Sequence, residues 1–223
     1  EGNNANTLYW QEETYLTYNK TFDKHYLNAM GGISWQERDY TYFSAVGSNF
    51  TDDFYGYYNL GKGEDRPSLS SDYDKWTMNS YFLRAAYSYD SKYMATVTGR
   101  YDGASKFGEN NKYAYFPSLA LAWKIHNEKF MSKQKLINEL KYRISYGVTG
   151  NDRIPAYRSL SRMDKAYYPG ATVSESGTTY DSNFGLAPSE SYNPNLKWES
   201  TRQYNTGLDL QMFKGRLTLG VDL

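Results

Sequence analysis

Eight segments of the chain alternate between apolar and polar residues at every second position. The clearest, 93–102, reads YMATVTGRYD, with Tyr, Ala, Val, Gly and Tyr on one face and Met, Thr, Thr, Arg and Asp on the other. A period of two is typical of a β-strand that has one apolar and one polar face. We therefore predict an all-β antiparallel meander with strands over 8–21, 25–40, 77–89, 93–102, 113–125, 139–149, 197–212 and 216–223.

The connections between these strands nearly alternate in length. The shorter ones cover 23–24, 90–92, 126–138, with a helical turn expected over 128–136, and 213–215; the longer ones cover 41–76, 103–112 and 150–196. Successive connections of an antiparallel meander lie at opposite ends of the sheet, so the short turns share one end. Outer-membrane barrels have this asymmetry, whereas a soluble sandwich with Greek-key connections has no reason for it.

The cysteine and histidine content and the net charge limit the kinds of function that this protein can have. The chain has no cysteine and only two histidines, His25 and His126, which both fall at expected short-turn ends. Thiolate metal sites, disulfides and most histidine chemistry are therefore excluded or disfavoured, and we expect no enzyme, no cofactor and no metal site. Lys+Arg and Asp+Glu are equal at 25 each, so no net charge attracts nucleic acid. No apolar run is long enough for a transmembrane helix.

Aromatic residues gather near the expected strand ends. They include Trp35, Tyr87, Tyr89, Tyr93, Tyr113, Tyr115, Trp123, Phe130, Trp198 and Phe213. Such girdles suit the headgroup layers of a membrane, because the ring is apolar and its tip polar. Cross-strand pairs in a soluble β-protein are the alternative. Together with the loop asymmetry, the girdles favour part of a large transmembrane β-barrel, although eight strands can also close a small one.

In such a barrel the polar face of each strand points to the lumen. The expected lumen-lining residues are Arg100, Arg143, Glu199, Gln203 and Asp209. Charges in this position must be paired or hydrated, so contacts among themselves or with a plug are favoured over substrate contacts. The expected substrate-binding aromatics of the long loops are Tyr55, Tyr57, Tyr58, Tyr167 and Tyr168. These side chains could stack on a sugar or pack against a partner.

Two loop motifs invite a structural interpretation. Asp102, Gly103 and Gly108 are expected to serve a turn, because Gly permits positive φ and Asp can bond its own turn backbone. Pro117 is expected at a strand beginning or a bulge, because it cannot donate a ladder hydrogen bond. The carboxylates Asp52, Asp53, Glu64 and Asp65 lack the spacing of a calcium-binding EF-hand loop. We interpret them as solvated surface charge.

Three blocks of sequence resemble one family. The segment DSKYMATVTGRYDGASKFGENNKYAYFPSLALAWKIHNEKFM is similar to the barrel signature of SusC/RagA-type TonB-dependent outer-membrane transporters. Its matching residues are Arg100, Asp102, Gly103, Ser105, Phe107, Gly108, Phe116, Pro117, Ser118 and Trp123. LKYRISYGVTGND, at 140–152, and NPNLKWESTRQYNTGLDLQMFKGRLTLGVDL, at 193–223, resemble the strands that follow. Ala104 and Lys106 depart from the usual Ser and Arg, and residues 1–75 carry no sharp motif.

The resemblance implies a barrel of about 22 strands closed by an N-terminal plug. It further implies an outer-membrane importer of glycans or peptides in Bacteroidetes-type bacteria, which works with a SusD-like lipoprotein and the TonB complex. We expect residues 1–223 to be a section of that barrel, lacking the plug, the TonB box and the remaining strands. The alternatives are a small complete outer-membrane barrel with a structural or adhesive role, and a soluble carbohydrate-binding β-domain.

Overall fold

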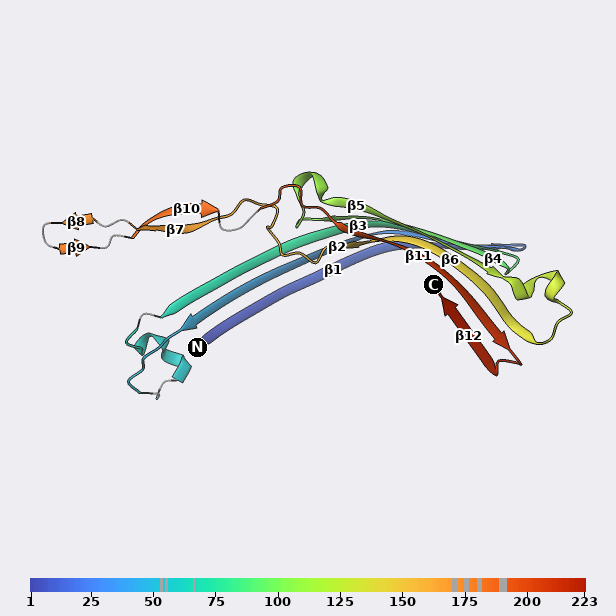
Figure 1. Cartoon of the computed structure of the whole chain (residues 1–223), viewed down its shortest axis with the longest axis horizontal. Coiled ribbons are helices and arrows are strands. Elements are labelled where there is room, and N and C mark those ends of the chain that lie inside the picture. The colour runs from blue at the N-terminus through green and yellow to red at the C-terminus, as the bar shows by residue number, and fades with distance from the viewer. Residues whose placement is uncertain are drawn as a thin grey trace.

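The chain folds into one long antiparallel sheet in the computed structural model (Figure 1). The structure describes residues 1–52, 54, 56–65, 67–169, 172–174, 177–179, 182–188 and 192–223. The eight strands of the sheet are β1 (Gly2–Phe22), β2 (His25–Val46), β3 (Ser68–Tyr89), β4 (Tyr93–Ala104), β5 (Tyr113–Lys124), β6 (Ile137–Asn151), β11 (Glu199–Met212) and β12 (Leu217–Asp222). Each strand pairs with its neighbour in the chain order β1-β2-β3-β4-β5-β6-β11-β12. The predicted all-β meander is confirmed.

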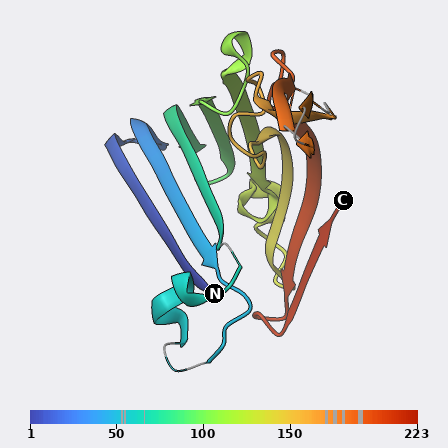
Figure 2. The ribbon, with the colours of Figure 1, turned by 90° about the vertical axis from the view of Figure 1, so that its left-hand side faces the viewer.

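The sheet curves but does not close on itself (Figure 2). Among the described residues, β1 pairs only with β2 and β12 only with β11. Directly paired residues carry their side chains on the same side of a sheet, so the register assigns each residue to one of two faces. We call them the apolar face, which holds Val97, and the polar face, which holds Thr98. Val97 pairs with Ala85 and Leu119, so the apolar side chains of neighbouring strands line up.

Nothing in the described part of the chain covers the apolar face. Leu16 is 82% exposed, Leu83 64% and Val97 53%. A soluble sandwich would press a second sheet against these residues. The absence of such a layer, within the residues described, removes the sandwich interpretation.

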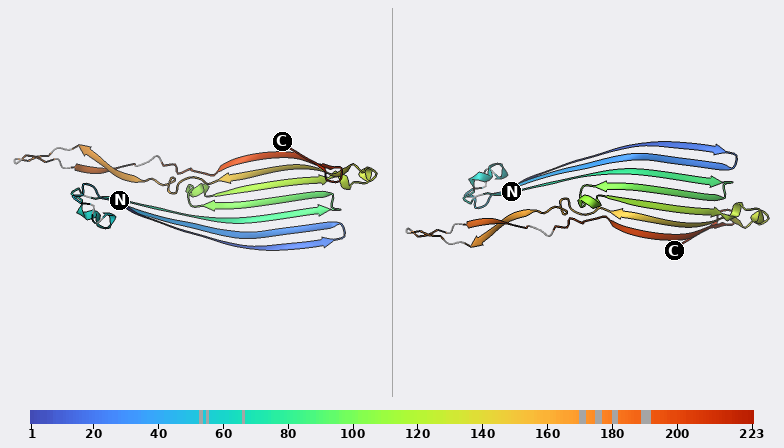
Figure 3. Two further views of the ribbon diagram at one scale, coloured as in Figure 1. Left: turned by 90° about the horizontal axis from the view of Figure 1, so that it is seen from below. Right: turned by 90° about the horizontal axis from the view of Figure 1, so that it is seen from above.

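The two ends of the strands differ as the connection lengths predicted (Figure 3). The tight turns at Asp23-Lys24, 90–92 and 213–216 lie at one end, with the connection that holds the 3-10 turns η3 (Ile125–Asn127) and η4 (Lys129–Met131). The expected helical turn over 128–136 is thus replaced by two shorter turns. We call this the short-turn end. The opposite, long-loop end carries 47–67, with η1 (Gly56–Lys62), then 105–112, with η2 (Glu109–Asn111), and 152–198.

Strands β1 to β3 extend further toward the long-loop end than predicted. β2 runs to Val46 rather than residue 40, and β3 begins at Ser68 rather than residue 77. These extensions carry polar residues on both faces, which abolishes the alternation. The backbone ladder continues there, supported by cross-strand ion pairs from Lys75 to Glu37 at 2.7 Å and from Arg38 to Asp74 at 2.8 Å.

The long loop 152–198 also holds strands that the sequence did not predict. β7 (Met163–Pro169) pairs with β10 (Ser182–Pro188), and β8 (Thr172–Ser174) with β9 (Gly177–Thr179). They form an arm that projects beyond the sheet (Figure 1). The sequences of β7, MDKAYYP, and β10, SNFGLAP, do not alternate strictly, and the three-residue strands β8 and β9 are too short for a period-two signal. No helix among the described residues has the length and apolar character needed to cross a bilayer.

Buried apolar residues are few, and they gather at the long-loop end. Ala104, Phe107, Phe116 and Ala156 are the buried hydrophobic residues of the described chain. The compact part of this chain is therefore a cluster of loops on one end of the sheet, and the sheet itself has no core of its own.

Candidate functional site

A row of ring side chains crosses the apolar face at the short-turn end. Phe22, His25, Tyr89, Tyr93 and Trp123 come from five successive strands and lie directly opposite one another in the register. Successive ring centroids lie 5.0, 4.9, 6.4 and 6.4 Å apart. The His25 ring also shares a 2.6 Å hydrogen bond with the Tyr87 hydroxyl. The girdle predicted at this end is present as a continuous row.

A second row lies on the same face toward the long loops. Tyr81, Tyr101 and Tyr115 are direct register partners on β3, β4 and β5. On each strand, the second row is eight residues from the first, which is about 26 Å along the strand at roughly 3.3 Å per residue. The face between the rows carries Leu83, Ala85 and Tyr87, Ala95, Val97 and Gly99, and Pro117, Leu119 and Leu121. These three strands, which are described in full, thus present an apolar band without charge.

Charged side chains on the apolar face lie mostly outside this band. Glu37, Asp39 and Lys75 are clustered beyond the second row. Two charged residues lie inside the band near its edges: Arg202, which pairs with Val148 two residues past the Tyr146–Tyr204 pair, and Lys20, two residues inside the first row on β1. A long lysine side chain near an interface can extend its charge to water. The pattern is that of a band about 25 Å tall between aromatic girdles.

A carboxylate at the short-turn end fixes the polar tips of the first row. The Glu128 carboxylate accepts hydrogen bonds from the Tyr93 hydroxyl at 2.5 Å and the Trp123 indole N–H at 3.1 Å. The Lys92 ammonium lies 3.7 Å from it and also pairs with Asp90 at 2.9 Å. The hydrogen bonds from Tyr93, and then from Trp123, hold the pKa of Glu128 below its ordinary value. In its charged form, Glu128 therefore links the start of β4, the end of β5 and the 90–92 turn.

This arrangement predicts an acid sensitivity confined to the short-turn end. A lowered folded pKa means that the stabilisation is complete above the unfolded value of about 4.3 and is lost as the pH falls through the folded value. We expect hydrogen exchange in segments 90–93 and 125–131, corrected for its intrinsic pH dependence, to accelerate over that range. Glu128→Gln should remove most of this pH dependence in 125–131, whereas Asp90, whose pKa is also lowered by its bond from Lys92, continues to contribute at 90–93. An unchanged acid response in that variant would contradict the role of Glu128.

The polar face carries the five residues expected to line a lumen. The register places Arg100, Arg143, Glu199, Gln203 and Asp209 on this one face. Two of their four charges pair with each other: Arg143 bonds both oxygens of Asp209 at 2.8 Å and also reaches Asp222 at 3.0 Å. Such forked pairs fix side-chain geometry as well as neutralise charge. The remaining partners are Asp102 for Arg100, at 3.1 Å, and Asn151 for Glu199, at 2.9 Å.

The three sequence blocks that resemble the transporter family meet in one cluster at the long-loop end. We call this cluster the loop hub; it comprises 104–112, 152–158 and 193–198, with Phe116 and the adjoining edge of β3. Phe107 is 2% exposed, and its ring lies 4.7 Å from that of Trp198. The Trp198 indole N–H donates to the Lys112 carbonyl at 2.9 Å. Trp198 was expected in a girdle; the structure instead places it in the hub.

A buried lysine links the hub to β3. The Lys106 ammonium lies 3.1 Å from the Asp152 carboxylate and 4.6 Å from the centre of the Trp76 ring. A cation held between a carboxylate and an aromatic face is favourable, and more so where water is excluded. The cluster therefore connects the 103–112 and 152–158 loops to the wall of the sheet.

The expected turn motif is wrong in place for Asp102 and Gly103, and wrong in its physical reason for Gly108 as well. Asp102 and Gly103 lie within β4, and Asp102 bonds Arg100 rather than a turn backbone. Among the described glycines, only Gly56 and Gly215 have positive φ. A Cβ on Gly103 would lie 2.3 Å from the Tyr113 ring, and one on Gly108 would lie 1.9 Å from the Pro194 carbonyl oxygen. Close packing, not turn geometry, requires glycine at both positions.

Pro117 lies inside β5 and not at its beginning. Residues 113–117 pair only with β4, and pairing with β6 begins at Ser118. Pro117 is thus the last residue of a stretch that has no partner on the β6 side. Proline is tolerated along such an edge because it lacks only a ladder hydrogen bond that is not needed.

The hub also caps an exposed strand edge. β3 pairs with β4 only as far as Met78, so its residues 68–77 have one free edge. The Thr77 N–H donates to Ser105 Oγ at 2.9 Å, and the Thr77 carbonyl accepts from the Ser105 N–H at 3.0 Å. The Lys75 N–H donates to the Tyr157 hydroxyl at 3.1 Å. Tyr157 has φ of 66°, which is uncommon for a bulky residue, and from there it reaches β3.

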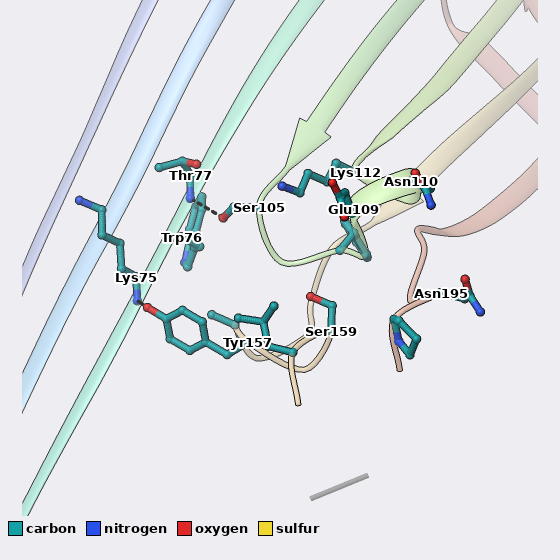
Figure 4. Close-up of a pocket in the computed structure, with 14 residues that line it drawn as sticks. Lys75, Trp76, Thr77, Ser105, Glu109, Asn110, Lys112, Tyr157, Ser159 and Asn195 are labelled. Carbon is teal, nitrogen blue, oxygen red and sulfur yellow. Dashed lines mark hydrogen bonds between the residues drawn. The ribbon is translucent and has the colours of Figure 1, made fainter. Parts of the chain in front are cut away.

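A cavity of about 680 Å³ lies beside this capped edge (Figure 4). Its walls come from β3, the 105–112 loop, the 156–160 loop and Pro194-Asn195. Trp76, Ser105, Glu109, Lys112, Tyr157 and Ser159 surround the open space in Figure 4. Its volume is in the usual range of ligand pockets. Sequence reasoning missed this site; the one available signal was that Trp76, Phe107 and Trp198 are bulky aromatics set in polar surroundings.

Of the five expected loop aromatics, the structure describes the side chain of Tyr58 alone. Tyr55 lies outside the described residues, and only the backbones of Tyr57, Tyr167 and Tyr168 are described. Tyr58 is 83% exposed on η1. Of the expected surface carboxylates, Asp52 accepts from the Phe54 N–H, Glu64 from Asn49 and Asp65 from Ser48. Asp53 lies outside the described residues.

Comparison with known proteins gives one consistent family. Residues 1–223 match the family model for the β-barrel of TonB-dependent receptor-like proteins. The chain is 39% identical over 220 residues to TonB-dependent receptor P3 of Formosa agariphila, covering 99% of the chain and 21% of that protein. It is 38% identical over 149 residues to TonB-dependent receptor SusC of Bacteroides thetaiotaomicron, covering 66% and 14%.

The fold has a close counterpart among solved structures. The chain superposes on a structure of the RagAB peptide importer in its closed-closed state with a TM-score of 0.85 and 27% identity. The match covers 99% of this chain and 23% of that one. The chain thus spans about a fifth of the length of the relatives it matches most fully.

Proposed function

Because the chain belongs to the family of TonB-dependent receptor β-barrels, we propose that it forms a section of the wall of an outer-membrane importer. In this proposal the apolar face contacts lipid and the polar face an aqueous or plugged interior. The long-loop end faces the outside, and the short turns face the periplasm. This asymmetry of loops is typical of outer-membrane barrels.

The observation that carries the proposal is the apolar band between two aromatic rows in register. Its length of about 26 Å along the strand is of the order of the hydrocarbon band of an outer-membrane barrel. A soluble protein would not leave Leu83 64% exposed in the middle of such a band. The polar face suits water because Arg143 and Asp209 form a paired but partly exposed cluster there.

The whole receptor is proposed to import glycans or peptides together with a SusD-like surface lipoprotein, energised through TonB. Support comes from the similarity to SusC and to the RagAB peptide importer. The relatives named are receptors and importers, which agrees with a non-catalytic role. The small complete barrel has less support, because the described strands β1 and β12 do not pair.

Two adjacent residues of β3 offer a direct test of which face of the sheet contacts lipid. This chain has no cysteine. Once any cysteine elsewhere in the full-length receptor is replaced by serine, single cysteines at Leu83 and Arg84 can each carry a bimane fluorophore. We expect brominated lipids to quench the label at Leu83→Cys strongly and the label at Arg84→Cys weakly, because only Leu83 lies on the apolar face. Equal quenching at both positions, or stronger quenching at Arg84, would overturn the proposal.

A further inference from the structure

The cavity beside β3 presents polar groups that are free to bind. Glu109, Asn110, Lys112 and Ser159 line it, and within the described part of the chain none of these four side chains has a hydrogen bond or ion pair. Trp76 and Tyr157 add two partly exposed aromatic rings to the lining. The site thus combines aromatic surfaces with neutral and charged hydrogen-bonding groups that have no partner among the described residues.

A peptide strand cannot add to the sheet at this site. Extended peptides bind by pairing with a free strand edge. The edge of β3 beside the cavity is already occupied, because the Lys75 and Thr77 N–H groups donate to Tyr157 and Ser105. The Thr77 carbonyl likewise accepts from Ser105. A ligand here must be recognised by side chains.

The charges of the lining largely cancel. Lys75 is paired with Glu37 at 2.7 Å, and Lys106, behind Trp76, with Asp152 at 3.1 Å. This leaves one cation, Lys112, and one anion, Glu109, at the two ends of the short 3-10 turn η2. Such a lining gives no net attraction to a sulfated or otherwise anionic ligand.

We propose that this cavity binds a neutral sugar unit. Its hydroxyl groups would bond Glu109, Asn110, Lys112 and Ser159, and its apolar ring face would lie against Trp76 or Tyr157, because aromatic side chains offer an apolar surface beside polar groups. The inference rests on the proposed function, because the site would face the outside only if the long loops do. Of the two classes of cargo proposed above, glycans and peptides, a sugar site in this cavity favours neutral glycans.

The test uses the full-length receptor in detergent and isothermal titration calorimetry. The probes are neutral hexose and pentose oligosaccharides of about three to six units, with peptides and sulfated oligosaccharides of similar size for comparison. Loss of one hydrogen bond should weaken sugar binding about three- to tenfold in Glu109→Gln and in Asn110→Ala. Both side chains are exposed, so both variants should fold. Glu139→Gln, at the short-turn end, is the matched control and should bind like the wild type.

Two results would overturn the assignment. One is the absence of binding by every neutral sugar; the other is binding that neither Glu109→Gln nor Asn110→Ala weakens. Preferential binding of a peptide or a sulfated sugar, weakened by these substitutions, would likewise refute a neutral-sugar site. The bimane experiment distinguishes a wrong sugar site from a wrong proposed function. Quenching by lipid at Leu83→Cys tests the proposed function alone, because it does not depend on any ligand.

Discussion

Val97→Arg is expected to destabilise the membrane-inserted receptor by about 2–4 kcal/mol, the range for a cationic residue facing lipid at mid-bilayer. Val97 lies on the apolar face of β4, midway between Tyr93 in one aromatic row and Tyr101 in the other. An arginine there has no charged partner on the apolar face of β3, β4 or β5. The measurement is equilibrium unfolding of the full-length receptor in lipid vesicles.

Thr98→Arg is the matched control for that substitution. Thr98 is the next residue of the same strand and lies on the polar face opposite Arg84 and Ser118. We expect it to cost markedly less free energy of unfolding, because its charge can reach water or a carboxylate. A loss at position 98 as large as that at position 97 would mean that the two faces have been assigned wrongly.

Phe107→Ala is expected to reduce the free energy of unfolding by about 3–5 kcal/mol, the cost of truncating a buried phenylalanine. Phe107 is 2% exposed and lies at the centre of the loop hub against Trp198. The void left by the missing phenyl ring would weaken the contacts that hold the 152–158 and 193–198 loops to the sheet. Hydrogen exchange of 193–198 should therefore rise together with the loss of stability.

The control for the hub is an exposed phenylalanine outside it. Phe130, in η4 at the short-turn end, is 68% exposed. Its replacement by alanine should change the free energy of unfolding by no more than about 0.5 kcal/mol. A similar loss in both variants, or unchanged exchange in 193–198 after Phe107→Ala, would show that the hub does not fasten these loops.

The strands of the sheet could be predicted from the sequence because their two faces differ: apolar residues lie on one face and polar residues on the other. In β4 the alternation from Tyr93 to Asp102 follows the faces almost residue by residue. The pattern disappears where both faces meet water, which is why the extension of β3 from Ser68 to Trp76 was not predicted. The pairing there depends on the backbone ladder and on ion pairs such as Lys75 with Glu37, which have no period.

The loop hub could not be predicted because its contacts join residues that are distant in the chain. Gly108 is glycine because of the Pro194 carbonyl, and nothing near Gly108 reveals that neighbour. The same holds for Lys106, which interacts with Asp152 and Trp76. The motif resemblance singled out Gly108, but local turn chemistry supplied the wrong explanation for it; Lys106 stood out only as a departure from the usual Arg.

The projecting arm begins and ends at nearly the same point. The Asn193 N–H donates to the Arg158 carbonyl at 3.1 Å, and the chain on either side is fixed in the hub. The entropy of closing a loop grows only slowly with its length. The arm can therefore be exchanged, lengthened or shortened in evolution while the eight paired strands of the sheet stay intact.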